Sequence, residues 1–339
     1  MLARFKTTIA ILGLLSPTFV WAGPFSTGLE NQTPGAVDPG VAGFVGPAGA
    51  GVVPTANNGN VVNPVFESWA TGVVNYSPTP GVSSAWKDPS KALGAVTGNN
   101  LDIVSLGDLT NPASPPAVGA KQPFSDDTRP YSGNLNDPND GWGFIGIDAP
   151  GQITLSFTNG ISMSGGADFV VFENSSGSQT NAFIELAYVE VSTNGVDFAR
   201  FPSTYLNTTP TGPFTTLDPT DIDNLAGKHV NAGGNSWGTP FSLGDLSNDP
   251  LVKSGAVDLS HIWYVRLVDI PGTGAFKDSL GNPIYDPTPT NGSSGFDLEA
   301  VGVIHQAVPE ASTMVLVGLS VAAFSLKRVA RRASKRASA

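Results

Sequence analysis

Short runs of β-branched and aromatic residues, each closed by Gly, Pro, Asn or Asp, limit what this chain can fold into more than any other feature. Such runs predict strands, and the Asn194-Gly195 pair between two of them indicates a β-hairpin. No long stretch keeps the spacing of an amphipathic helix, although residues 89–96 and 221–227 each allow one helical turn. The predicted strands are 101–106, 142–147, 152–157, 168–172, 183–192, 198–201, 262–270 and 296–304.

This pattern predicts an all-β fold with a single β-sandwich of the jelly-roll type over residues 62–305. The 40 Gly and 28 Pro suit a loop-rich β protein, and hydrophobic residues, at 40%, supply enough side chains for one core. A parallel β-helix is the alternative, but the chain has no fixed internal period. Residues 23–61 predict a Gly/Pro-rich flexible leader with a short edge strand at 43–45.

Charge is unevenly placed along the chain. Two of the 17 Lys and Arg residues lie in the first 22 positions and six lie after position 326, which leaves nine against 28 acids, a balance of −19. A surface this acidic repels nucleic acid, so no nucleic-acid partner is expected, and it suits divalent cations. With no cysteine, the domain must be stabilised by burial, short turns or bound ions.

The first 22 residues read as a secretory signal peptide. Arg4 and Lys6 precede an apolar stretch at 8–20, and small residues three and one before Gly23 place cleavage after Ala22. A retained membrane anchor is the alternative, but the apolar stretch is shorter than the about 20 residues that a span requires.

The tail at 306–339 has three parts in order: Val308-Pro309-Glu310, a short apolar helix at 311–326 and a basic cluster at 327–336. The positive-inside rule keeps the cluster in the cytoplasm and the preceding domain outside. The alternative is an ordinary C-terminal membrane anchor. The cations of the basic stop are Lys327, Arg328, Arg331 and Arg332.

These three parts resemble the PEP-CTERM sorting signal of exported proteins in Gram-negative bacteria, with Ala311 where the family has a second proline. The resemblance implies export through the general secretion machinery and processing by a membrane exosortase. It also implies a transient or lasting membrane anchor, delivery to the cell surface or extracellular matrix, and association with exopolysaccharide.

Residues 62–305 also resemble a recurrent bacterial cell-surface domain that PEP-CTERM proteins often carry. That resemblance implies architecture and location but no reaction. The stretches that carry it include "DIVSLGD", "GQITLSF", "DFVVFEN", "AYVEVSTNGVDFARFPS", "GTPFSLGDL", "VRLVDI" and "GFDLEAVGVI".

Catalysis finds little support in the residues, and the chain is predicted not to be an enzyme. A nucleophilic triad needs a base beside a Ser or Cys, yet His229, His261 and His305 lie in no nucleophile or zinc motif. Paired carboxylates of a glycosidase or lyase are the remaining enzymatic alternative, although 28 acids produce such pairs by chance. The candidates are Glu173, Glu185, Glu190, Asp297 and Glu299.

Oxygen-bearing residues at the ends of two predicted strands favour calcium. Glu173 and Asn174 follow the strand at 168–172, while Asp297 and Glu299 open the last strand. Hard cations take about six to eight such oxygens, so these four residues are the predicted calcium ligands. Solvated acids are the alternative. A second oxygen-rich loop contains Asp137, Asn139 and Asp140.

Sugar binding requires exposed aromatic residues. Trp237 and Tyr285 fall in predicted loops and are the candidate glycan contacts, whereas Trp263 alternates with apolar residues as packed strand residues do. A packing role for the two loop aromatics is the alternative. The sequence therefore predicts a non-enzymatic exported surface or matrix protein, structural or adhesive, with a carbohydrate-binding module as the second interpretation.

Overall fold

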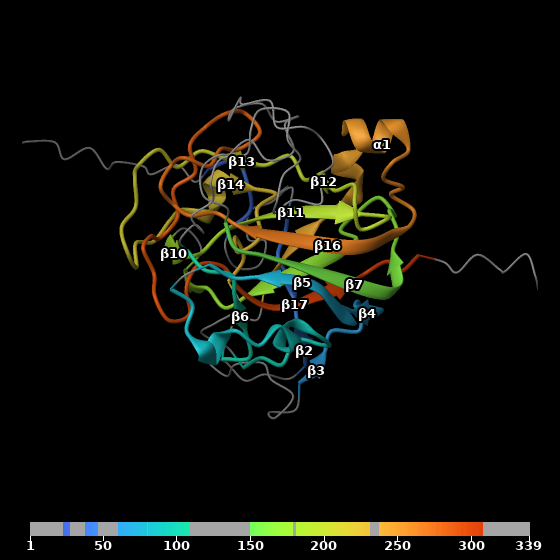
Figure 1. Ribbon diagram of the computed structural model, residues 1–339, viewed down its shortest axis with the longest axis horizontal. Helices are drawn as coiled ribbons and strands as arrows, with labels where there is room; N and C mark the ends of the chain where they lie inside the picture. The colour runs from blue at the N-terminus through green and yellow to red at the C-terminus, as the bar shows by residue number, and fades with distance from the viewer. Residues whose placement is uncertain are drawn as a thin grey trace, which may run out of the picture.

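The computed structural model describes residues 23–27, 38–46, 60–79, 81–99, 101–108, 150–178, 181–230 and 237–307. Within these ranges the protein is mostly β, with several antiparallel sheets that curl around a common core (Figure 1). The predicted signal peptide, the strand at 142–147, the loop with Asp137 and the sorting tail from Val308 onward lie outside the described residues.

The first sheet has the order β1-β15-β8-β17-β4, with β6 also paired to β17. Its central strands are buried on both faces, as their apolar runs predict. Between β8 and β17 the register shifts at Leu298/Ala300, so Glu299 is the extra residue of a bulge. The strands are β1 (Val41–Ala42), β4 (Ser68–Trp69), β6 (Val104–Ser105), β8 (Phe169–Glu173), β15 (Trp237–Phe241) and β17 (Asp297–Val303).

The second sheet has the order β12-β11-β16-β7-β5, and all its neighbours are antiparallel. The predicted hairpin at Asn194-Gly195 joins β11 to β12, and Gly195 has a φ of 74°, which favours glycine. The strands are β5 (Gly72–Ser77), β7 (Gln152–Ile161), β11 (Ala187–Ser192), β12 (Ala199–Arg200) and β16 (Ile262–Asp269).

Short pairs and helical turns complete the described elements. The helical turn that residues 89–96 allow is present. Of residues 221–227, only Asp221 belongs to a helical turn, because Ile222 and Asp223 pair with β13 and Ala226 pairs with Ala187. None of the helices in the described ranges has the length and apolarity to cross a membrane. The elements are β2 (Phe44–Val45) with β3 (Val61–Val62), β9 (Ser176–Ser178) with β10 (Asn181–Phe183), β13 (Thr204–Tyr205) with β14 (Ile222–Asp223), α1 (Pro250–Ser254), and 3-10 turns Ser84–Trp86, Pro89–Ala92, Pro219–Asp221 and Leu243–Leu246.

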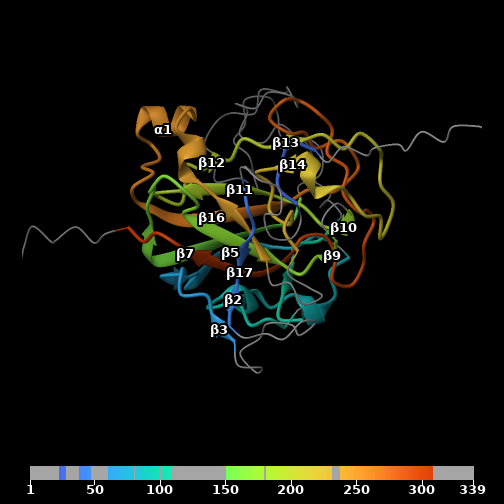
Figure 2. The ribbon, with the colours of Figure 1, turned by 180° about the vertical axis from the view of Figure 1, so that it is seen from behind.

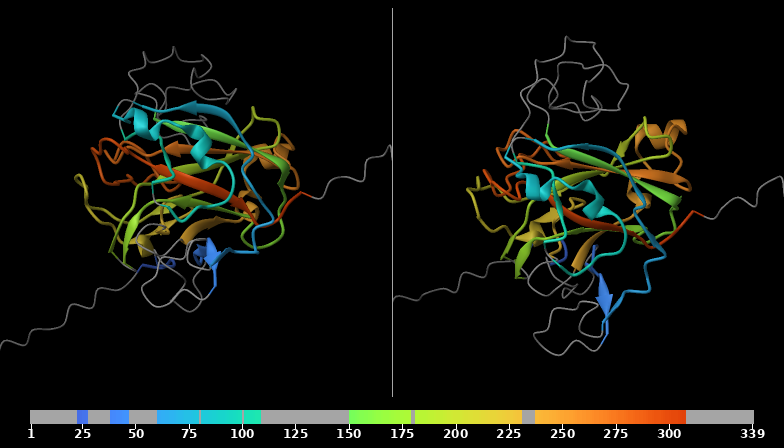
Figure 3. Two further views of the ribbon diagram at one scale, coloured as in Figure 1. Left: turned by 90° about the horizontal axis from the view of Figure 1, so that it is seen from below. Right: turned by 60° about the horizontal axis from the view of Figure 1, so that its bottom comes forward.

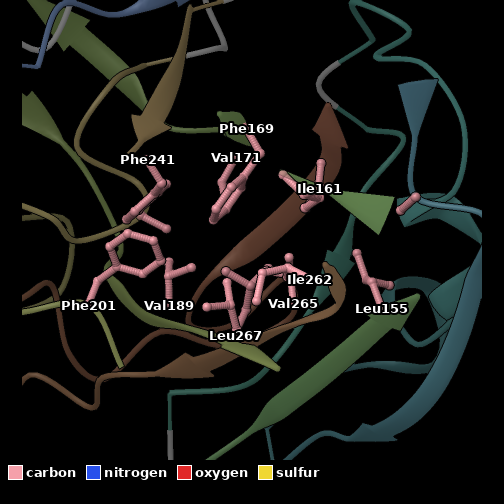
Figure 4. Packing of buried hydrophobic residues seen from close by; sticks show 14 of the residues in the cluster. Leu155, Ile161, Phe169, Val171, Val189, Phe201, Phe241, Ile262, Val265 and Leu267 are labelled. Carbon is pink, nitrogen blue, oxygen red and sulfur yellow. The ribbon is translucent and has the colours of Figure 1, made fainter. Parts of the chain in front are cut away.

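The main core lies where side chains of the two larger sheets meet (Figure 4). Phe169 of β8 and Phe241 of β15 stack with ring centroids 5.3 Å apart, and Phe201 packs on Phe241 at 5.0 Å. The outer face of the first sheet carries a smaller hydrophobic cluster, in which the ring centroids of Trp69 and Phe172 lie 5.9 Å apart. Turn Pro89–Ala92 packs beside β17 on this sheet (Figure 3).

Part of the segment expected to be a flexible leader is built into the fold. The expected edge strand at 43–45 is present as β2, and β1 pairs with β15 at the edge of the first sheet. The Gly23 N–H donates to Thr220 Oγ1 at 2.7 Å. The described residues of the N-terminal segment, coloured blue, run across the face of the molecule shown in Figure 2.

Candidate functional site

The ends of β8 and β17 bring three of the four predicted calcium ligands together. The strands are antiparallel and Leu298 pairs with Glu173, so the end of β8 lies beside the start of β17. The Asn174 N–H lies 3.4 Å from the Asp297 carbonyl oxygen, and its side chain bonds to the Asp297 carboxyl. Glu173, Asn174 and Asp297 therefore form one group.

Asp297 lies among further oxygen-bearing side chains. Ser105 of β6 pairs with Asp297, and its hydroxyl donates to Asp297 Oδ1. Ser293 also forms a hydrogen bond with this carboxyl group. Burial raises the pKa of Asp297 to about 7, and the bonds from Ser105, Ser293 and Asn174 oppose that rise.

Glu299 flanks this group. Its Oε1 accepts from the N–H groups of Thr97 at 3.0 Å and Gly98 at 3.1 Å, so a loop holds it on its far side. Burial raises its pKa to about 7, against these two bonds. Its charge also acts on Glu173, and its other oxygen, Oε2, is buried without a hydrogen-bond partner among the described residues.

The fold brings four more acids to this group, which the sequence alone did not indicate as neighbours. Glu185 lies between β10 and β11, Asp286 in the loop before β17, Asp269 at the end of β16 and Asp108 after β6. No local pattern marks them, because they converge from segments far apart in the sequence. We call the six residues the carboxylate cluster: Asp108, Glu173, Glu185, Asp269, Asp286 and Asp297.

Each of four cluster carboxylates accepts a backbone N–H with one of its oxygens. The donor and acceptor pairs are Ser175 N to Glu173 Oε2 at 2.8 Å, Leu186 N to Asp286 Oδ2 at 2.9 Å, Phe296 N to Asp269 Oδ1 at 2.7 Å and Thr290 N to Asp108 Oδ2 at 2.6 Å. Glu185 Oε1 instead accepts the Thr290 hydroxyl at 2.9 Å. The side chains are therefore fixed in position.

Burial followed by mutual repulsion sets the electrostatics of the cluster. It raises the pKa values of Glu173, Glu185, Asp269 and Asp286 well above their ordinary range. Burial alone raises the pKa of Asp108 to about 6, against its hydrogen bonds. The described ion pairs of Lys and Arg all go to other acids, so within the described residues repulsion in the cluster meets no counter-charge.

Three buried oxygens of the cluster have no hydrogen-bond partner among the described residues: Glu173 Oε1, Asp269 Oδ2 and Asp286 Oδ1. In the described part of the chain no three Asp, Glu or His side chains are placed to hold a metal ion as they stand. A site here must therefore combine two carboxylates with neutral oxygens, of which Asn174, Ser105 and Ser293 are at hand.

The remaining enzymatic candidates have structural partners. Glu190, 2% exposed, is held between Arg200 and Arg266. A triad histidine meets its serine and its aspartate through different nitrogens. Here both approach the same atom, Nδ1: His261 with Asp258 and Ser260, and His305 with Asp168 and Ser164.

The two predicted glycan contacts lie apart in the fold. Trp237 opens β15 and pairs with Ala42 of β1. Tyr285 packs on the core cluster around Tyr205, whose hydroxyl donates to the Tyr285 carbonyl oxygen. Both are half-buried, and neither is among the described residues that line the pocket discussed next.

A pocket of about 810 Å³ opens between the N-terminal segment and the body of the fold. Phe25 and Asn224 line it, together with three prolines (Pro39, Pro202, Pro240) and three aspartates (Asp38, Asp223, Asp245). We call it the acidic pocket. Burial, followed by the charge of Asp38, raises the pKa of Asp223 to about 6. The sequence did not predict this pocket, because several of its lining residues, such as Phe25 and Asp38, lie in the segment expected to be a flexible leader.

Comparison with known proteins adds no relative. The chain matches no family model, and a search of curated proteins finds no match.

Proposed function

We propose that this is an exported, non-enzymatic surface or matrix protein whose β domain, a sandwich of the jelly-roll type, has a structural or adhesive role. Support comes from the two chain ends, which read as a signal peptide and a sorting tail. The antiparallel strand order and the shared core of the two larger sheets support the sandwich.

Burial of the acids is the observation that carries this proposal. Glycoside hydrolysis requires two carboxyl groups that touch the sugar on either side of its scissile bond. Glu173, Glu185, Glu190 and Asp297 are only 1–3% exposed. Acids inside the fold act on the fold itself, which favours a structural role over a glycosidase or lyase.

Mass spectrometry of the protein recovered from its native cell tests the sorting. We expect a mature chain that begins at Gly23 and ends near Glu310, cut by an exosortase-type enzyme. A chain that retains Arg331 and Arg332 would mean that the tail is an ordinary membrane anchor.

Two variants at the sorting motif sharpen this test. Pro309→Ala should leave the tail attached, whereas Ala311→Pro, which restores the proline usual in the resembling signal, should be processed at least as completely as the native chain. Equal processing of all three chains would contradict recognition at this motif. Both positions lie outside the described residues.

Carbohydrate binding is a second candidate function, and the acidic pocket favours it. The carboxylates and the Asn224 amide oxygen can accept hydrogen bonds from sugar hydroxyl groups, and the Phe25 ring offers an apolar face for a sugar ring. Titration calorimetry with exopolysaccharide from the producing cell tests this. Phe25→Ala and Asp245→Asn should each weaken binding, while Phe214→Ala, an exposed phenylalanine outside the pocket lining, should not.

Trp237→Ala and Tyr285→Ala belong in the same titration, because the sequence predicts these residues as glycan contacts. If only these two changes weaken binding, the sugar lies outside the acidic pocket. If no change has an effect, the glycan-binding candidate fails.

A further inference from the structure

The carboxylate cluster gathers six acids that have no counter-charge in their described surroundings. All six side chains are at most 3% exposed, and none forms an ion pair with a described Lys or Arg. A buried carboxylate that lacks a counter-charge destabilises a fold strongly. The fold must therefore either hold these groups protonated, as their raised pKa values allow, or bind a cation where they meet.

The hydrogen bonds show which form of the carboxylates the fold is built for. Four of them accept a backbone N–H, a bond that favours the ionised group over the neutral acid. In Glu173, Asp269 and Asp286 one oxygen is anchored in this way while the other is buried and has no partner among the described residues. Fixed carboxylates with a free second oxygen are suited to ligate a cation.

Close packing of the backbone around the cluster supports a built site. A Cβ at Gly295 would lie 2.6 Å from Asp269 Oδ1, and one at Gly272 would lie 2.4 Å from Asp286 Oδ1. Glycine at these positions lets two loops approach the carboxylates more closely than any other residue would allow.

We propose that the cluster binds at least one calcium ion, with Glu173 Oε1 and Asp297 as charged ligands and the oxygens of Asn174, Ser105 and Ser293 as neutral ones. Two carboxylates with amide and hydroxyl oxygens form a hard, all-oxygen set that suits Ca²⁺. Zinc would call for His or Cys, and Mg²⁺ keeps several waters that a buried site excludes. The inference concerns stability and does not depend on the proposed sorting or adhesion.

Metal analysis and thermal melting of the purified native protein test the proposal directly. We expect bound calcium that EDTA removes, and a melting temperature that rises on the order of 5–10 °C when saturating Ca²⁺ is returned. Mg²⁺ at the same concentration should give a smaller rise. No retained calcium and equal melting with and without EDTA would overturn the proposal, as would equal rises with both ions.

Glu173→Gln and Asp297→Asn place the ion. Each should weaken Ca²⁺ binding at least tenfold, while Asp258→Asn, an exposed acid 53% accessible, should bind as the native protein does. In EDTA the two cluster variants should melt no lower than the native protein, because each loses an uncompensated buried charge. Native affinity in both cluster variants would overturn this placement.

Terbium luminescence locates the site without changing a ligand. The hydroxyl of Tyr76 donates to the Ser105 carbonyl oxygen at 2.7 Å, and the charge of Asp297 acts on it, so this ring lies beside the proposed ion. Tb³⁺ in place of Ca²⁺ should emit when tyrosine is excited, and Tyr76→Phe should reduce that emission with Tb³⁺ still bound. Unchanged emission would put the ion elsewhere and overturn the placement.

Discussion

Glu190 shows how a single residue neutralises buried charge in the second sheet. It lies directly across from Arg200 on β12 and from Arg266 on β16, so both guanidinium groups reach its carboxylate. Arg266 also lies 3.8 Å over the ring of Phe198. Here the strand register provides the counter-charges that the described surroundings of the carboxylate cluster lack.

Glu190→Gln removes this shared charge at nearly constant volume. We expect the free energy of unfolding to fall by about 3 kcal/mol, because Arg266 stays buried without its counter-charge. The melting temperature should fall by about 6–12 °C, measured by calorimetry. Lys91→Met, which removes the exposed pair with Asp102, is the control, and a loss as large there would contradict the argument.

Asp223 gives the acidic pocket a pH-dependent stability. Its pKa is raised to about 6 when folded, so the folded protein holds a proton there that the unfolded chain has released. Its stabilising contribution is complete below about pH 4 and is lost as the pH rises through about 6. Relative to the native protein, Asp223→Asn should therefore gain about 1–2 kcal/mol between pH 4 and 7 in urea titrations.

Asp258→Asn is the matched control for that pH series. A hydrogen bond from Ser260 lowers the Asp258 pKa, so this carboxylate stabilises the fold above its unfolded pKa and stops doing so as the pH falls. That change falls below about pH 4, so between pH 4 and 7 its substitution should shift stability by a constant amount. Parallel trends in the two variants would contradict the assignment to Asp223.

At the scale of elements, the strands that sequence predicts well are those with continuous apolar runs, such as β8 and β16. β5 and β15 were missed, because β5 is a half-exposed edge and β15 contains Gly238 and Pro240. The run at 183–192 was predicted as one strand but divides in two. Glu185 and Leu186 leave the sheet there to bond with Thr290 and Asp286.

The candidate site was predictable in part, where its residues mark the ends of strands. Glu173, Asn174 and Asp297 mark strand ends, which sequence patterns locate, and the pairing of β8 with β17 brings them together. Asp108 lies in a loop and Asp269 ends β16, and they meet only when the whole fold has formed, so no local signal could assign them to the cluster.

Close packing between β15 and β8 predicts the effect of a single methyl group. A Cβ at Gly238 would lie 2.4 Å from Val170 Cγ1 and 2.8 Å from Phe172 Cε1. Gly238→Ala should therefore destabilise the protein by about 1–3 kcal/mol in urea titrations. At Gly166 a Cβ meets open space, and neither glycine has a positive φ, so Gly166→Ala should leave stability unchanged or slightly raised. Equal losses would contradict the packing argument.

At the scale of the whole molecule, a buried ion pair attaches the N-terminal segment to the body. Lys228 is fully buried and its ammonium group meets Asp38, 190 residues away. Ser26 donates to the same aspartate. The Gly/Pro-rich sequence around Asp38 predicted flexibility because its ordering depends on this remote lysine and on no local pattern.

Lys228→Met tests that attachment. Asp38 would lose its counter-charge, so amides of residues 38–46 should exchange with solvent at least tenfold faster, measured by hydrogen exchange with mass spectrometry. Adding Asp38→Asn removes the unpaired charge and should restore part of the protection. Equal exchange in the native protein and the single variant would contradict a role for the pair.

The position of β17 in the first sheet has a consequence for how the chain folds as it emerges. Although β17 is the last strand of the described residues, it pairs with β8, β4 and β6 in the interior of the sheet. A chain that emerges N-terminus first, as from the ribosome, therefore holds the edge of β8 open until residues 297–303 arrive. Completion of the first sheet is a late event, coupled to release of nearly the whole domain, and a chain stopped before Asp297 exposes apolar strand edges to its neighbours.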